Sequence, residues 1–405
     1  MTFYVRFRTA YENGQKNGIV KFARERFFCK TDTTNIFDED SPFLAAIDMR
    51  VQLSSKTHKQ LIPSELSKQI TSHGRIVDVF PDHRQYFYSG FSAEPLLAEA
   101  SAQGLDVPNN FVRLTKKLDW LLEKFDGEKG DRGELVSRIL LTLAHDRAIL
   151  ELEKTSPSID NQIRFTRPLK VIDFLKALIH EDHHDRVLDS HPQIHQKNSK
   201  PLKEEFANAF INFTYFMKAS DSTVASTSFI WKALSLSGAI QCIHEQREID
   251  TIIPLIFARD GVDQTKITEE TVSAILIQVK NRISGKDVNI NTKTLNFFKT
   301  QGIRSCIGIV MELGERKGTL QIVKVPERTT EMQTRGSDGE KNPMYFIEIN
   351  GTHGAYGGIN DEESDALNSL LSKGSADGEY QHEGEKFRDA RRRLMVTVGE
   401  DSFEH

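Results

Sequence analysis

The chain has 405 residues, which is enough for two or three domains with a sizeable core. Apolar residues at 38% and charged residues at 27% are ordinary for a soluble globular protein. The net charge of −5 excludes a chain that is basic overall, so any basic surface that binds nucleic acid must be local.

The cysteines and the first residues both indicate an intracellular protein. Cys29, Cys242 and Cys306 lie far apart without Cys-x-x-Cys spacing, which argues against a disulfide framework or a zinc ribbon. The opening residues 1–6 lack the apolar region of a signal peptide, and no run approaches the ~20 apolar residues of a membrane span. We therefore expect a cytoplasmic or nuclear location and no membrane partner.

The first half of the chain predicts a small α+β segment followed by helices. Residues 1–90 contain short strand-like runs at residues 4–7 and 76–80, and a helix near residues 63–70. Ser92-Ala93-Glu94-Pro95 joins a cap residue to an early proline, which is typical of a helix start. Residues 131–150 predict the clearest helix, because one apolar stripe runs along them: Leu135, Val136, Ile139, Leu140 and Leu143. Further helices are expected at residues 111–125, 169–179 and 204–218.

After residue 226 the pattern changes to short apolar runs, which are typical of strands. Strands are expected at residues 239–243, 248–257, 274–282, 306–313, 320–325 and 344–349, with a helix within residues 291–302. An acidic helix at residues 361–373 and a polar tail follow. The expected architecture is therefore a mixed α/β fold in three parts: residues 1–90, residues 91–358 with a large helical insertion at about 155–235, and residues 359–405.

Two of the expected strands carry polar residues that a core strand does not need for packing. Strand alternation puts Gln278 and Lys280 on one face, ~7 Å apart along the strand. Asp250 enters the preceding strand. The Gln-x-Lys pattern alone does not indicate a functional site, because a second copy, Gln264-Thr265-Lys266, lies in a polar loop. Its position on an apolar strand after Asp250 predicts a site for a divalent metal beside a phosphate.

A set of candidate ligands for Mg²⁺ follows, with Mn²⁺ as an alternative ion. Asp250 would be the central ligand, and Glu134, on the first turn of the clearest helix, would supply a second carboxylate. Gln278 could add its amide oxygen and Val279 its main-chain oxygen, since magnesium prefers one or two carboxylates completed by other oxygens. Lys280 would stabilise the charge that develops on the phosphate.

At these residues the chain resembles the PD-(D/E)XK, restriction-endonuclease-like nuclease superfamily. The order helix-Glu134, strand-Asp250, strand-Gln278-Val279-Lys280 is that superfamily's order, and the Gln form is similar to its Mrr-type branch. The segments at residues 132–146 and 90–100 also resemble a large group of functionally uncharacterised fungal proteins with mobile-element-like or effector-like features.

The resemblance implies a restriction-endonuclease-like mixed sheet flanked by helices, and a Mg²⁺-dependent nuclease that hydrolyses phosphodiester bonds. Its partner would be nucleic acid, with DNA expected before RNA. Three features depart from the superfamily's usual pattern. Asp250 and Gln278 stand 28 positions apart, the helical insertion is large, and Pro254 lies inside a strand, where proline favours an edge or a bulge.

Two alternative functions remain. The first is a nuclease fold without catalysis, which serves as a binding or interaction module. The second is a zinc metalloprotease, because His180-Glu181-Asp182-His183-His184 matches His-Glu-x-x-His, a pattern that places two imidazoles on one helix face. Against the second reading, the apolar period fails at His180, and five histidines within residues 180–195 indicate a solvated turn.

Overall fold

The computed structural model describes most of the core of the chain. It covers residues 19–28, 40–53, 55–58, 68, 70–79, 86–91, 94–105, 129–156, 163–192, 199–219, 227–243, 248–258, 261, 265–281, 290, 304–314, 322–325 and 342–372. The elements expected at residues 4–7, 111–125 and 291–302, most of the helix near residues 63–70, and the tail from residue 373 lie outside these residues.

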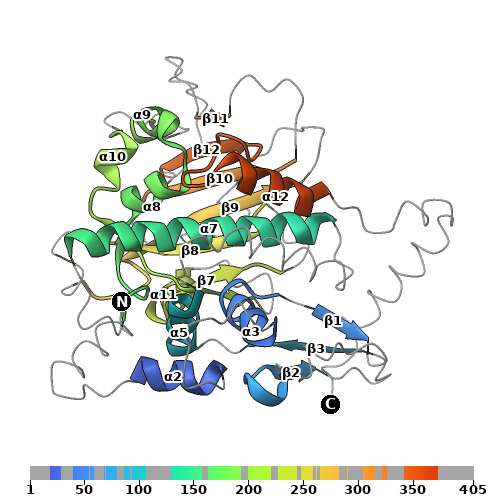
Figure 1. Ribbon diagram of the computed structural model, residues 1–405. Coiled ribbons are helices and arrows are strands. Elements are labelled where there is room, and N and C mark those ends of the chain that lie inside the picture. Colours follow the sequence, from blue (N-terminus) through green and yellow to red (C-terminus); the bar gives the residue numbers. More distant parts are fainter. Residues whose placement is uncertain are drawn as a thin grey trace, which may run out of the picture.

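A mixed sheet, which has nine strands within the described residues, forms the centre of the molecule (Figure 1). Its main path is β11-β12-β10-β9-β8-β5-β4, while β7 pairs with β8, and β6 with β7. The strands are β4 (Leu169–Lys170), β5 (Ala209–Ile211), β6 (Tyr215–Lys218), β7 (Gly238–Gln241), β8 (Thr251–Phe257), β9 (Val272–Lys280), β10 (Cys306–Glu312), β11 (Val323–Lys324) and β12 (Met344–Asn350). β8 runs antiparallel to β9, whereas β9, β10 and β12 are parallel. The prediction of a mixed α/β fold is confirmed.

Pro254 lies within β8 at a point where the neighbouring strand changes. On one side of β8, β7 pairs with Thr251 and Ile252, and β5 pairs with residues 255–257. Pro254 falls between these two neighbours. The break in the ladder accommodates a residue without a backbone N–H donor, which is the edge or bulge position that proline favours in sheets.

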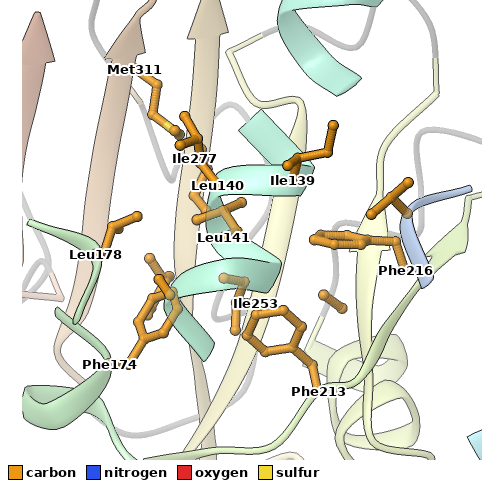
Figure 2. Close-up of a cluster of buried hydrophobic side chains, with 14 of the residues drawn as sticks. Ile139, Leu140, Leu141, Phe174, Leu178, Phe213, Phe216, Ile253, Ile277 and Met311 are labelled. Atoms are coloured by element: carbon orange, nitrogen blue, oxygen red, sulfur yellow. The ribbon is translucent and has the colours of Figure 1, made fainter. Parts of the chain in front are cut away.

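Helices cover both faces of the sheet. The long helix α7 (Lys129–Thr155) crosses one face, which it shares with α8 (Val171–Leu178), α12 (Asp361–Ser372) and α3 (Asp40–Val51) (Figure 1). Figure 2 shows the core below α7, where Ile139, Leu140 and Leu141 lie among Ile253, Ile277, Met311 and a group of aromatic side chains. The opposite face packs against α11 (Thr227–Ser235) and Ala98 of α5 (Pro95–Leu105). Residues of β9 alternate between these cores, with Ile275, Ile277 and Val279 toward α7 and Ala274 and Leu276 toward α11.

The N-terminal segment shares the core that lies below α7. It contains α2 (Ile19–Phe28), α3 and a three-stranded antiparallel sheet of β1 (Ser55–His58), β3 (Tyr86–Gly90) and β2 (Ile76–Val79). Phe28 and Phe43 belong to the same buried cluster as the α7 residues. Within the described residues, packing is therefore continuous across residue 90, where the sequence suggests a domain division.

Two arginines attach α3 to α7. Arg50 donates from Nη1 and Nη2 to the carboxylate of Asp146 at 2.5 and 2.7 Å, and from Nε to Thr214 O at 3.0 Å. Arg138 on α7 donates from Nε to Val51 O at 2.8 Å, where α3 ends. The last carbonyls of a helix lack intrahelical donors, so Arg138 satisfies one of them.

The helix predicted at residues 204–218 is wrong. The segment forms only the short α10 (Leu202–Glu205) and then the strands β5 and β6. The residues after Ala207 form a nearly continuous apolar and aromatic run, which suits a strand that is buried on both faces and overrides helical periodicity. Together with β4, these strands add to the central sheet, so the predicted insertion at about 155–235 is not purely helical.

Helix α5 is fixed by a buried carboxylate to the segment that follows α7. Glu99 accepts hydrogen bonds from the backbone N–H groups of Arg164, Phe165 and Thr166 at 2.6–3.0 Å. Charge-assisted bonds of this kind are about twice as strong as neutral ones.

No described helix is long and apolar enough to cross a membrane.

Candidate metal centre

Asp250 closes the ladder between β8 and β9. It stands one residue before β8, and its backbone N–H donates to Ile277 O at 2.8 Å. Its carboxylate Oδ2 accepts a hydrogen bond from the backbone N–H of Val279 at 2.6 Å. The side chain therefore takes the place of a backbone acceptor at the end of the ladder, which fixes its position. The N–H group of Val279 therefore faces the Asp250 carboxylate.

The start of α7 lies directly on the end of β9. A Cβ atom added to Gly133 would stand 2.9 Å from Asn281 Cβ and 3.6 Å from Val279 Cγ1. Only glycine allows the helix to approach this closely. Since Glu134 is the next residue, the close approach brings its backbone to the strand end that Asp250 caps.

Replacing Gly133 with alanine should move the start of α7 away from β9. Overpacking of this kind costs about 1–3 kcal/mol of folding stability, and it should weaken metal binding because Glu134 moves with the helix. Gly130→Ala is a matched control on the same helix, since nothing lies within 4 Å of its added Cβ. Thermal unfolding and Mn²⁺ titration of both variants would check this. Equal behaviour of the two would contradict the close approach.

Cys242 is a buried cysteine whose main chain contacts Asp250. The backbone N–H of Cys242, just after β7, donates to Asp250 O at 2.9 Å. Burial raises the pKa of the Cys242 thiol, and the negative charges of Asp250 and Glu134 raise it further. The main chains at the end of β7 and the start of β8 are therefore in direct contact through Cys242 and Asp250.

Gln278 and Lys280 lie on the sheet face opposite α7. Thr251 pairs with Ile277, so Asp250 stands opposite Gln278 across the two strands. Gln278 is 8% exposed, and its Oε1 has no hydrogen-bond partner among the described residues. Lys280 ends β9 and is half-buried. The structure thus brings Asp250 beside both Val279 and Gln278, whereas Glu134 starts from α7 on the other face of the sheet.

The residues present fit a small divalent cation that prefers oxygen ligands. The carboxylates of Asp250 and Glu134 would supply charge. The buried Oε1 of Gln278 is an acceptor without a donor in the described part of the chain, a costly state that a cation would relieve. In the described part of the chain, no three His, Cys, Asp or Glu side chains lie in metal-binding geometry. The expected set of metal ligands contains only two such side chains, Asp250 and Glu134, and is completed by amide, main-chain and water oxygens.

Sequence reasoning missed three residues beside this site. Arg138 lies 3.6 Å from Glu134, measured from Nη1 to Oε2. Glu312 ends β10 directly beside Lys280 in the parallel register and is buried. Cys242 is the third. A charged residue at the end of an apolar strand was the signal available for Glu312, while Arg138 could have been found by its i, i+4 spacing from Glu134.

The His-Glu-x-x-His pattern does not form the helix that a zinc site of this kind requires. His180 has extended backbone and precedes the 3₁₀-helix η4 (Glu181–His183), whereas His184 begins the separate helix α9 (His184–Leu188). His184 Nε2 lies 3.0 Å from Lys176 O and 2.9 Å from Ile179 O, and so donates to main-chain oxygens. The two imidazoles therefore do not share one helix face.

Comparison of the chain with protein-family models, with curated proteins and with solved structures found no match in any of the three.

Proposed function

We propose that this protein is a Mg²⁺-dependent nuclease of the restriction-endonuclease-like type. The observation that carries the proposal is the 2.6 Å bond from Val279 N–H to the Asp250 carboxylate, opposite Gln278, whose buried Oε1 has no donor among the described residues. The order of Glu134, Asp250 and Gln278-Val279-Lys280 along helix, strand and strand supports it. The mixed sheet around these residues is also the kind that the resemblance implies.

Some of these residues would bind the cation, and others would contact the phosphate. Asp250 and Glu134 would hold Mg²⁺, completed by Gln278 Oε1 and Val279 O. When bound, the ion supplies positive charge beside phosphate oxygens and lowers the pKa of a water molecule that it binds. Val279 N–H keeps the Asp250 carboxylate in one orientation, so less conformational freedom is lost when substrate binds.

Lys280 is the proposed catalytic cation. Lys280 is the last residue of β9, two positions after Gln278, and its side chain is half-buried. An ammonium group at this position stabilises the negative charge that builds up on the phosphate oxygens in the transition state. Because the net charge of the chain is −5, attraction of nucleic acid would depend on such local cations and on the bound metal.

Incubation of the purified chain with nucleic acids tests the function directly. Supercoiled and linear DNA and a structured RNA would each be incubated with Mg²⁺, with Mn²⁺ or with a chelator. We expect cleavage with either ion, DNA preferred over RNA, and none with chelator. Cleavage that survives the chelator would contradict the metal-dependent mechanism.

The same experiment distinguishes a binding module from an enzyme. Retention of DNA in a mobility-shift assay without Mg²⁺, together with intact substrate in all metal conditions, would overturn the catalytic proposal. That result would point instead to a nuclease fold that has kept only binding.

A further inference from the structure

A buried arginine links the candidate ligand Glu134 to the end of another helix. Arg138 is 4% exposed and follows Glu134 by one helical turn. Its Nε donates to Val51 O at 2.8 Å, and its Nη1 lies 3.6 Å from Glu134 Oε2. The second distance is within ion-pair range but too long for a hydrogen bond. One rigid guanidinium plane thus faces a fixed carbonyl and a carboxylate.

The Glu134 side chain is only partly covered by the protein. Its side chain is 23% exposed and starts from the first turns of α7. Long side chains lose substantial rotamer entropy when they are ordered. The backbone next to it is held by the contact of Gly133 with the end of β9, which fixes the position of the Glu134 Cα.

We infer that Arg138 is a positioning residue that holds the Glu134 carboxylate toward the metal centre. Nε fixes the guanidinium on the C-terminal carbonyl of α3, and Nη1 then orients the carboxylate electrostatically. The inference rests on the proposed function, since it assigns Glu134 to the metal. It also gives the N-terminal segment a role at the site, because α3 provides the anchor.

Lysine cannot replace this arginine. A guanidinium presents several donors in a fixed plane, so one group serves Val51 O and Glu134 together, whereas an ammonium is a point charge on a flexible stem. The geometry therefore predicts that charge alone does not restore function at position 138. A purely electrostatic role would predict the opposite.

Titration of the full chain with MnCl₂ by calorimetry tests the inference without depending on cleavage. The variants are Arg138→Lys and Arg138→Gln. The control is Arg147→Gln on the same helix, whose arginine donates from Nη1 to Gly357 O at 2.9 Å, away from the site. Loss of a partner that orients a metal ligand typically costs ~10–100-fold in affinity. We expect both Arg138 variants to bind Mn²⁺ at least about tenfold more weakly than wild type, and Arg147→Gln to bind as wild type does.

A double-mutant cycle with Glu134→Gln separates positioning from a general loss of structure. If Arg138 acts through Glu134, adding Arg138→Gln to Glu134→Gln causes no further loss of Mn²⁺ affinity. An equal loss in both backgrounds, wild-type affinity in Arg138→Lys, or weakening by Arg147→Gln would each overturn the inference. If Arg138→Gln fails to fold, the comparison rests on Arg138→Lys, which keeps the charge and most of the stem.

The nuclease assay run in parallel keeps the two proposals apart. If the wild type binds Mn²⁺ but cleaves nothing, the catalytic proposal fails while the titration still decides the role of Arg138. If cleavage is metal-dependent and the Arg138 variants bind Mn²⁺ normally, only the positioning role fails. If the wild type binds no Mn²⁺, the metal centre itself is wrong and both proposals fall.

Discussion

Lys280→Ala should lower Mg²⁺-dependent cleavage about 10²–10³-fold, because removing one preorganised group that stabilises transition-state charge has that effect in enzymes. Asp250→Asn should reduce cleavage at least as much, since the central carboxylate of the candidate metal centre loses its charge. Single-turnover cleavage at saturating Mg²⁺ is the measurement. The two variants should differ in metal response, with only Asp250→Asn requiring much more Mg²⁺.

The chain provides a matched control for the lysine. Lys266 ends the second Gln-x-Lys copy and is exposed before β9, so Lys266→Ala makes the same chemical change outside the site. Asp173→Asn, on the exposed surface of α8, is the corresponding control for Asp250. Both controls should cleave as wild type does. If Lys280→Ala and Lys266→Ala have equal rates, the assigned site is wrong.

Asp146→Asn should destabilise the fold by about 2–4 kcal/mol, because it leaves the buried guanidinium of Arg50 without its counter-charge. The Arg50 side chain is 3% exposed and that of Asp146 18% exposed, and the bidentate pair joins α3 to α7. Urea unfolding at neutral pH would measure the loss. The double variant Arg50→Met/Asp146→Leu should be less destabilised than Asp146→Asn, because it removes both charges together.

The difference between wild type and Asp146→Asn should also depend on pH. Burial acts to raise the pKa of the Asp146 carboxyl, but the charge and hydrogen bonds of Arg50 outweigh it, so the pKa lies below its usual value. A lowered folded-state pKa contributes stability above the unfolded value, near ~3.9 for Asp, and this stability is lost as pH falls through the folded pKa. The two proteins should therefore converge in stability below about pH 4. A constant difference down to pH 2 would contradict the assignment.

Local sequence patterns predicted the elements whose apolar residues repeat without ambiguity. Residues 131–150 gave α7 within a few positions at each end, and the strands at β7, β8, β9, β10 and β12 were found for the same reason. The errors fell where two patterns overlap. Residues 204–218 carry enough apolar residues to fit either period, and only pairing of β5 with β8 and of β6 with β7 selected the strand.

The candidate site, too, could be predicted from local sequence patterns only in part. Strand alternation was sufficient to put Gln278 and Lys280 on one face, because side-chain direction along a strand has a period of two. It could not reveal that Glu134 approaches from the opposite face, nor that Gly133 is the residue that allows this approach. These facts depend on how α7 crosses the sheet, which no local pattern encodes.

By itself the sequence determined the types of most elements and the order of the Glu134 helix and the strands of Asp250 and Gln278, and it suggested the residues that we propose act on a phosphate. Only the tertiary structure decided that Asp250 bonds to the Val279 N–H, that Arg138 joins Glu134 to α3, and that the histidine-rich turn is not a zinc helix. The reason is physical. Periodicity is set by neighbours a few positions apart, whereas these contacts join residues 29 positions apart (Asp250 and Val279) or 87 positions apart (Arg138 and Val51).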